Sequence, residues 1–211
     1  MKKIFAFYII SSIILSVLSG CSAKIDLVNE NATGLLEGND LRQILKQIGR
    51  PKAKVFETFS LTEDQLTDMD SGREWLLPTT REIEGEEFTQ ELLFDNHDPY
   101  NLLIFRCTFH PEEYDEDEFR ELAVSIALKA AELYGKPLHY EGHNLLDDEG
   151  NRAKELGRMG DFIEIWELSK DEALRMQVNM NFRYIWLNYR VQNGMYLEYL
   201  KPHKPKKINK Q

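Results

Sequence analysis

Two segments of the chain carry hydrophobic residues at helical spacing. Residues three and four positions apart lie on one face of a helix, so each segment predicts an amphipathic helix with one buried face. The apolar positions of the first segment are Leu41, Ile44, Leu45 and Ile48. Those of the second, longer segment are Phe119, Leu122, Ala123, Ile126, Ala130 and Leu133.

Both predicted helices have the same start and stop signals. An aspartate, Asp40 or Asp115, precedes each run, and a Gln or Glu follows three residues later, as in a capping box. Each run ends at a glycine, Gly49 or Gly135, with a proline two residues beyond it. The two glycines are 86 residues apart, and because the same signals recur in the same order, the chain is expected to contain an internal repeat.

The segments after the two helices predict strands in matching order. Alternation of apolar and polar residues is clearest over residues 174–181, with a turn inferred near residues 179–182. Short connections allow these strands to pair antiparallel, whereas parallel pairing needs long crossovers. The predicted strands are residues 55–59, 74–84, 87–94 and 102–110 in the first half, and 138–141, 162–168, 174–181 and 184–191 in the second.

The sequence therefore predicts an α+β fold made of two tandem units, residues 38–111 and 112–194. Each unit would be a helix packed on a four-stranded antiparallel sheet. Chance similarity is the alternative to a true repeat, because the two halves share little sequence identity.

The first 20 residues follow a different pattern. Lys2 and Lys3 precede an apolar run from Ile4 to Leu18, and small residues follow it. A membrane-spanning helix needs about 20 apolar residues. This run is shorter and contains three serines, so residues 1–20 are predicted to be a cleaved secretory signal peptide.

The sequence Leu18-Ser19-Gly20-Cys21 resembles a bacterial lipobox. The resemblance implies that Cys21 receives a diacylglyceryl thioether and an N-acyl chain such as palmitate, and becomes the mature N-terminus. Several acyl chains anchor a protein stably in a membrane. Ser22 and Ala23 follow, and by similarity to the enteric sorting rule the absence of aspartate there favours the outer membrane, facing the periplasm.

Both ends of the mature chain are predicted to lie outside the folded units. Residues 21–37 are mixed and polar and predict a lipidated tether. Residues 195–211 predict a basic, disordered tail, because they combine prolines with lysines and cannot bury a core. The tail's lysines are Lys201, Lys204, Lys206, Lys207 and Lys210.

The folded part is strongly acidic. Without residues 1–20 the chain has 24 basic and 36 acidic residues, and the lysines of the tail leave only 19 basic residues for the body. This balance argues against nucleic acid as a partner and favours a basic protein. The alternative is that the acidic surface only keeps an exported protein soluble.

The two cysteines do not predict a disulfide. Once Cys21 is lipidated, only Cys107 remains. It alternates with Leu103, Phe105 and Phe109, which places it on the apolar face of a strand as a buried structural thiol.

Two groups of residues are candidates for binding a partner. The first is an acidic run that exceeds what a helix N-terminus uses: Glu112, Glu113, Asp115, Glu116, Asp117 and Glu118. The second is Tyr184, Trp186 and Arg190, residue types that dominate protein interfaces. A solvated helix entrance is the alternative for the first group. For the second group, the alternative is that Trp186 lies in the core, and this alternative is favoured slightly.

No catalytic motif, cofactor site or metal site is predicted. His139 and His143 lie four apart, but Glu141 does not stand where a zinc protease motif requires it. The sequence also contains neither a phosphate-binding loop nor a nucleophile elbow. We therefore expect a protein that is not an enzyme.

The element order around Gly49-Arg50-Pro51 and Gly135-Lys136-Pro137 is similar to that of two groups of exported proteins: the tandem domains of the β-lactamase-inhibitor-protein kind and the small outer-membrane assembly lipoproteins. Those families generally use two helices per unit, whereas one is predicted here. The resemblance and the charge favour a lipid-anchored periplasmic protein-binding lipoprotein. Its sharpest form is an immunity or inhibitor protein against a basic toxin. The alternatives are an envelope assembly or structural lipoprotein and, third, a hydrolase or metal-dependent enzyme.

Overall fold

The computed structural model describes residues 24–97, 99–111, 113–138, 144–147, 149–153 and 161–191. Cys21, Glu112, the histidine pair at 139 and 143, and the tail from residue 195 lie outside these ranges. The helical elements are α2 (Gly38–Leu45), α3 (Lys52–Phe59), a 3₁₀ turn (Glu63–Gln65) and α4 (Glu116–Tyr134). The strands are β1 (Ala32–Thr33), β2 (Thr67–Asp68), β3 (Glu74–Ile83), β4 (Glu86–Phe94), β5 (Leu102–Phe109), β6 (Asp161–Glu167), β7 (Glu172–Asn179) and β8 (Tyr184–Val191).

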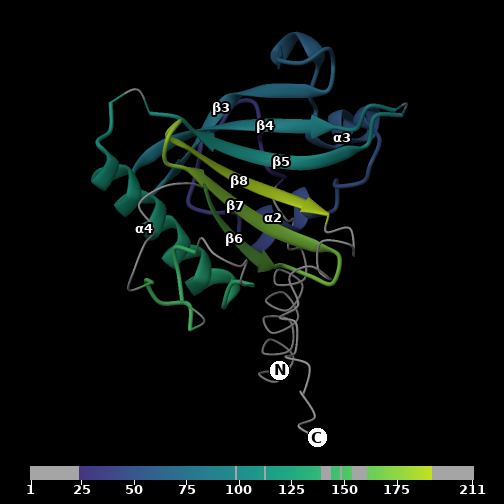
Figure 1. Cartoon of the computed structure of the whole chain (residues 1–211). Helices are drawn as coiled ribbons and strands as arrows, with labels where there is room; N and C mark the ends of the chain where they lie inside the picture. The colour runs from purple at the N-terminus through teal and green to yellow at the C-terminus, as the bar shows by residue number, and fades with distance from the viewer. Residues whose placement is uncertain are drawn as a thin grey trace, which may run out of the picture.

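The strands form one mixed eight-stranded sheet, with the order β1-β3-β4-β5-β8-β7-β6 and with β2 also on β3 (Figure 1). The α+β class is confirmed, but the prediction of two separate four-stranded units is wrong. Each half contributes an antiparallel meander, β3-β4-β5 or β6-β7-β8. The two meanders join because β5 pairs antiparallel with β8, from Ile104 opposite Arg190 to Phe109 opposite Ile185.

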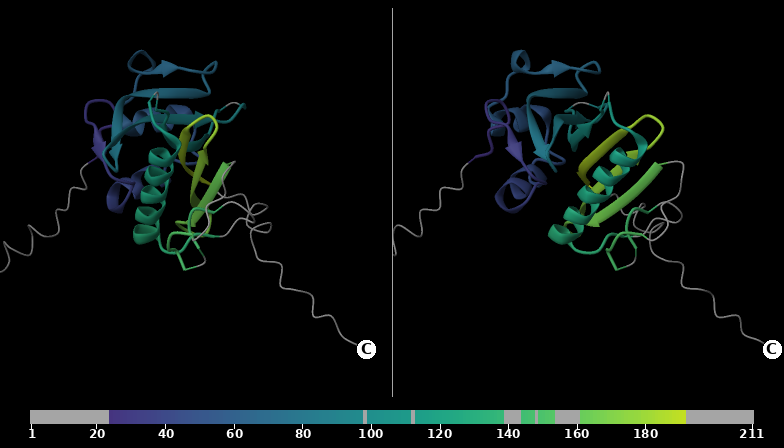
Figure 2. Two further views of the ribbon diagram at one scale, coloured as in Figure 1. Left: turned by 60° about the vertical axis from the view of Figure 1, so that its left-hand side comes forward. Right: turned by 90° about the vertical axis from the view of Figure 1, so that its left-hand side faces the viewer.

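All three α-helices cover the same face of the sheet. Phe56 of α3 packs edge-on against Trp75 and Phe94, which belong to β3 and β4. On α4, the hydroxyl of Tyr134 donates to the main-chain oxygen of Leu36, near α2. In Figure 1 α2 lies behind the strands, and Figure 2 shows α4 alongside β6–β8. No described helix lies on the other face, which we call the outer face.

Helix α4 forms as the sequence predicts. Asp115 accepts a hydrogen bond from the backbone N–H of Glu118 at 2.8 Å, and the Glu118 carboxylate accepts from the backbone N–H of Asp115 at 3.5 Å. This capping box satisfies two of the N–H groups that a helix start leaves unpaired. The helix ends at Gly135, whose φ of 87° suits a residue without a side chain.

The first half departs from the prediction in two places. Residues 55–59 were expected to form a strand, but they lie in α3, where Phe56 and Phe59 pack into the core. The capping box expected at Asp40 is absent, because α2 already begins at Gly38. The side chain of Gln43 instead accepts a hydrogen bond from the backbone N–H of Ile25 at 3.3 Å.

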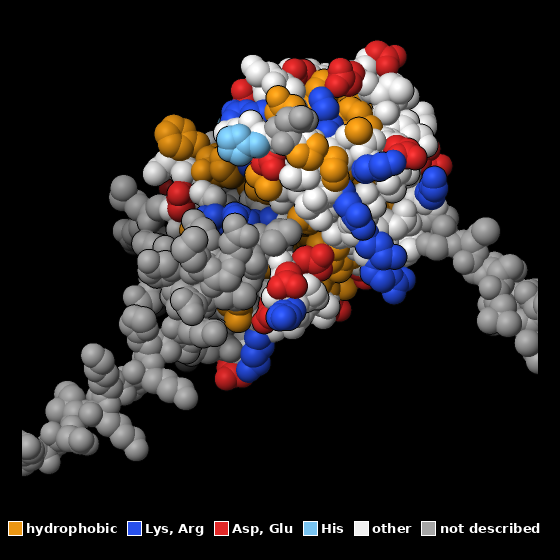
Figure 3. All heavy atoms as spheres, turned by 90° about the vertical axis from the view of Figure 1, so that its right-hand side faces the viewer, with side chains coloured by type: hydrophobic (Ala, Val, Ile, Leu, Met, Phe, Trp, Pro, Cys, Tyr) orange, Lys and Arg blue, Asp and Glu red, His pale blue; other side chains and the backbone are white. Residues whose placement is uncertain are grey.

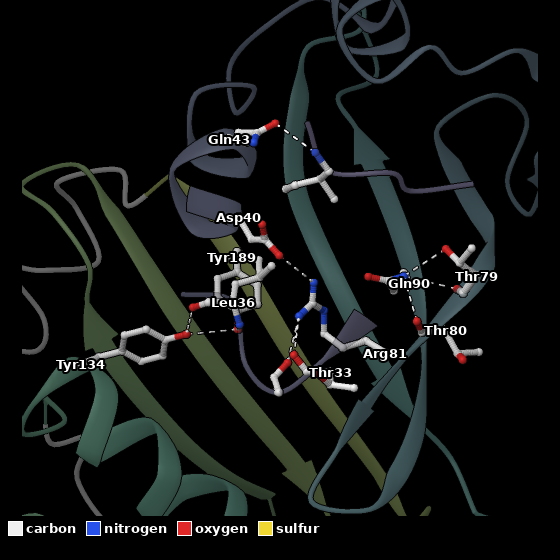
Figure 4. A network of polar contacts seen from close by, with 12 residues as sticks. Thr33, Leu36, Asp40, Gln43, Thr79, Thr80, Arg81, Gln90, Tyr134 and Tyr189 are labelled. Atoms are coloured by element: carbon white, nitrogen blue, oxygen red, sulfur yellow. Dashed lines mark hydrogen bonds and ion pairs between the residues drawn. The ribbon is translucent and has the colours of Figure 1, made fainter. Parts of the chain in front are cut away.

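The structure places residues 25–36 in the fold rather than in a tether. Leu27, Leu35 and Leu36 are buried among the core residues. Polar side chains of the sheet also bind this segment (Figure 4). Arg81 donates to the main-chain oxygens of residues 33 and 34 at 3.2 and 3.0 Å, and the Tyr189 hydroxyl accepts from the backbone N–H of Leu36 at 3.1 Å. The domain therefore begins within a few residues of Cys21.

Cys107 is buried on β5, on the helix-covered face, as predicted from its alternation. Burial raises the pKa of its thiol to about 12, because the low-dielectric core disfavours the thiolate. The structure therefore assigns this thiol to the core.

Candidate partner-binding site

Three segments meet at one end of the sheet: the β3–β4 turn, the β7–β8 turn and the start of α4. The strand pairing brings the two turns together, because Phe109 at the end of β5 lies opposite Ile185 at the start of β8, while Thr108 pairs with Thr89 near the start of β4. The third segment joins them through Arg183, whose guanidinium donates to the main-chain oxygen of Tyr114. We call this the acidic end.

Carboxylates dominate the acidic end. The exposed or half-buried ones within the described residues are Glu82, Glu84, Glu86, Glu87, Glu113, Asp115, Glu116, Asp117, Glu118 and Asp161. Arg120 forms ion pairs with Glu116 and Asp117, while Glu84 accepts from Ser125 and Glu86 from Tyr114. The remaining carboxylates of the hairpin and Glu113 make no such bond with a described residue.

Internal contacts thus account for part of the acidic run singled out in the sequence. Asp115 and Glu118 form the capping box of α4, and Arg120 holds two more carboxylates. The hydrogen bond to Glu86 raises the pKa of the Tyr114 phenol to about 12. These contacts fix the geometry of the acidic end before any partner arrives.

Phe182 is exposed on the β7–β8 turn of the acidic end. It is 71 % exposed, the most exposed of the large hydrophobic side chains described. The turn that carries it is well defined, because the side chain of Asn179 accepts from the backbone N–H of Phe182 at 2.7 Å. Arg183 follows with a φ of 49°, a left-handed conformation that turns the chain into β8. The turn inferred near residues 179–182 is confirmed.

Trp186 lies on the outer face, not in the core. Ile185, Leu187 and Tyr189 point to the helices and are buried, so the residues alternating with them point outward. The Tyr184 ring stacks on Trp186 with centroids 4.2 Å apart, and the Arg106 guanidinium carbon lies 4.7 Å from the Trp186 ring centroid. Tyr184 and Trp186 are therefore preorganised next to the acidic end.

Arg190, the third member of that predicted group, lies elsewhere. It stands at the far end of β8 opposite Ile104, six residues from Tyr184. At about 3.3 Å per residue this places it about 20 Å away. The structure thus brings Tyr184, Trp186 and the acidic run to one end and separates Arg190 from them.

Arg106, at the centre of the outer face, holds the stacked rings of Tyr184 and Trp186 in place. Arg106 donates to Asn188 at 2.9 Å and to the Glu91 carboxylate at 3.3 Å, and its ion pair with Glu74 spans 3.7 Å. Burial raises the pKa of Glu91 although Arg106 opposes that shift. The guanidinium is therefore fixed on one side of Trp186.

Glu164 is an unexpected carboxyl in the core. It lies on β6 between Phe162 and Trp166, all three facing the helices, and its Oε1 accepts from the backbone N–H groups of Leu145 and Leu146 at 2.5 and 3.0 Å. Burial raises its pKa to about 7. These two hydrogen bonds fasten the 144–147 segment to β6. The described residues contain no group of three potential metal ligands.

Comparison with protein-family models, curated proteins and solved structures found no match to this chain. The helices of the described residues include none long and apolar enough to cross a membrane.

Sequence reasoning missed Phe182 and the carboxylates of the β3–β4 hairpin. The hairpin signal was present, since Glu84 and Gly85 separate two alternating runs and both have positive φ. The sequence pattern did not indicate that β5 pairs with β8. This pairing brings the hairpin to the same end of the sheet as Phe182.

Proposed function

We propose that this chain is a lipid-anchored protein of the bacterial envelope that binds a basic protein partner through its acidic end. The observation that carries the proposal is Phe182, an exposed aromatic residue on a turn that is bonded to the acidic segment before α4. An apolar anchor within a charged rim is the usual arrangement of an interface hot spot.

The electrostatics support a partner with a positive surface. The described cations at the acidic end are Arg120 and Arg183, and both are already bonded within the protein. Unpaired carboxylates accelerate the approach of a basic partner and select against acidic ones. A toxin or enzyme with a basic face fits this chemistry, as the immunity or inhibitor form of the proposal requires.

The rigidity of the neighbouring stack supports binding as well. Tyr184 and Trp186 already contact each other and Arg106, so a partner that reaches past Phe182 meets ordered side chains. Ordering these groups before association lowers the entropy cost of binding.

Site-specific photocrosslinking in cells tests the proposed face. A photoreactive phenylalanine replaces Phe182 in one strain and Leu128 in the control strain. Leu128 is 39 % exposed but lies on α4, well away from its N-terminal end. We expect a protein adduct from position 182 only, and mass spectrometry of that adduct identifies the partner. Equal adducts from both positions would remove the acidic end as the binding site.

Charge variants then test the chemistry with the identified partner. Reversing Glu82, Glu87 and Glu113 to lysine is expected to weaken binding at least about tenfold at low salt, and less at high salt. Reversing Glu132, Glu149 and Glu167 makes the same change in net charge away from the acidic end and serves as the control. The lipid anchor is tested separately: a Cys21→Ser chain should leave the membrane fraction.

A further inference from the structure

The surface formed by residue 24, α2 and the turn between α2 and α3 differs from the acidic end. The exposed cations there are Lys24, Arg42, Lys46 and Arg50, and none forms an ion pair with another described residue. Figure 3 views this side and shows Lys and Arg side chains in a band with hydrophobic side chains beside it. Asp26, Glu30 and Asp40 lie among them, so the four cations exceed these carboxylates by one, in a chain with a net charge of −10.

Two exposed apolar side chains adjoin these cations. Tyr100 and Leu103 are 38 % and 47 % exposed. Backbone hydrogen bonds hold them beside Arg50, whose main-chain oxygen accepts from Leu102 at 2.8 Å, while the N–H of Lys52 donates to Tyr100 at 2.9 Å. We call these two residues and the four cations the anchor-side surface.

The path of the chain keeps this surface close to the lipidated residue. Ile25 is bonded to α2 through Gln43, so only residues 22–24 separate Cys21 from the packed domain. Four peptide units span at most about 14 Å. Lys24 and Arg42 line one hollow of about 680 Å³ at this point. A lipid on Cys21 therefore holds this part of the domain at the membrane.

From these observations we propose that the anchor-side surface lies against anionic phospholipid headgroups and so fixes the orientation of the domain. This inference rests on the lipidation of Cys21 in the proposed function. Several acyl chains already hold Cys21 at the membrane, so the surface charge decides only how the domain is oriented there. Each Lys or Arg near an anionic surface favours that orientation about fivefold. Tyr100 and Leu103 supply the apolar contact at the interface.

The acidic residues of this region set which cations matter most. Asp26, Glu30 and Asp40 line the same hollow as Lys24 and Arg42 and offset their charge. Lys46 and Arg50 lie outside that hollow, so the attraction is strongest there. In this orientation Phe182 points away from the membrane, because β5 and β8 separate it from Leu103 by about 25 Å.

Energy transfer on the full lipidated chain tests the orientation. Leu103→Cys and Phe182→Cys each carry one fluorophore, and an acceptor is attached to lipid headgroups in vesicles of phosphatidylethanolamine and phosphatidylglycerol. Cys107 is buried and Cys21 carries the lipid, so labelling is specific. We expect transfer from residue 103 to exceed that from residue 182 at least about threefold, given the separation above. Equal transfer from both positions overturns the inference.

Matched charge variants test the cause. Lys46→Gln with Arg50→Gln should reduce transfer from residue 103 by about half, as should replacing phosphatidylglycerol by phosphatidylcholine. Lys129→Gln with Lys136→Gln removes the same charge elsewhere and should change nothing. A loss that follows only from replacing the tail lysines overturns the inference. A lipidated chain that floats with vesicles but shows no preferred orientation refutes only this inference, whereas a chain that does not float refutes the anchor and this inference with it.

Discussion

The guanidinium of Arg183 donates a hydrogen bond to the main-chain oxygen of Tyr114. This contact joins the β7–β8 turn to the segment that leads into α4, across 69 residues of sequence. It brings Phe182 and the acidic run to the same end of the molecule. The β5–β8 pairing places both segments at this end, and the Arg183 contact ties them to each other.

Replacing Arg183 tests that connection. Arg183→Asn keeps a residue that tolerates the positive φ but removes the long donor. We expect the free energy of unfolding to fall by about 1 kcal/mol. Hydrogen exchange should become faster at residues 113–118, while the C-terminal turn of α4, residues 130–134, serves as the internal control. Unchanged exchange in both segments would show that the contact does not fix the acidic run.

The pair of Arg106 and Glu91 predicts a strongly non-additive result. Arg106→Met leaves the mostly buried Glu91 carboxylate without its main partner, which should cost about 3 kcal/mol in urea unfolding. Combining it with Glu91→Leu removes the unpaired charge and should restore most of that loss. Trp186 fluorescence should shift to the red in both variants, because both lack the guanidinium on its ring. Additive losses would argue against a coupled pair.

Glu164 predicts how stability depends on pH. Its pKa of about 7 in the folded chain lies above the ordinary value of 4.5, so folding favours the protonated form. This contribution is complete below about pH 4.5 and is lost as the pH rises through about 7. It amounts to about 3 kcal/mol at most.

The Glu164→Gln variant isolates that contribution, since it cannot titrate. Between pH 5 and pH 8, the free energy of unfolding should fall less in this variant than in the native chain. Urea unfolding at the two values measures the difference, and other carboxylates cancel in the comparison. Identical pH profiles for the two proteins would contradict the raised pKa.

Cys107 should be inert in the folded protein. Burial and a pKa of about 12 withhold the thiolate that reacts with thiol reagents. In the mature chain carrying Cys21→Ser, we expect no reaction with an aromatic disulfide reagent near neutral pH and one reacting thiol in urea. Rapid reaction of the native form would show that β5 opens readily.

Sequence patterns correctly predicted the elements that are stabilised by contacts between neighbouring residues. The periodicity and caps of residues 115–135 predicted α4, because the Asp115–Glu118 box and Gly135 act within one turn of the helix. Alternation predicted the six long strands for the same reason. The prediction of a strand at residues 55–59 was wrong, although Val, Thr and Phe favour strands. Packing of Phe56 on Trp75 and Phe94 stabilises a helix there instead.

The site was predictable only in part. The acidic run and the Tyr184–Trp186 pair were recognised by residue type, but their proximity was not. The default core position for Trp186 failed because strand parity across the β7–β8 turn decides which side chains point inward. A turn without Gly or Pro, as at Phe182, leaves that parity open in the sequence.

By itself the sequence determined the α+β class, the main helix, the six long strands and the acidic balance of the chain. These follow from periodicity, capping and charge, which act between neighbouring residues. Only the tertiary structure decided that two meanders merge into one sheet, that residues 25–36 belong to the fold, and that the β3–β4 hairpin, Phe182 and the start of α4 share one end. The pairing of β5 with β8 brings these segments together. Contacts between residues about 80 positions apart leave no mark on local patterns, so the sequence could not reveal this pairing.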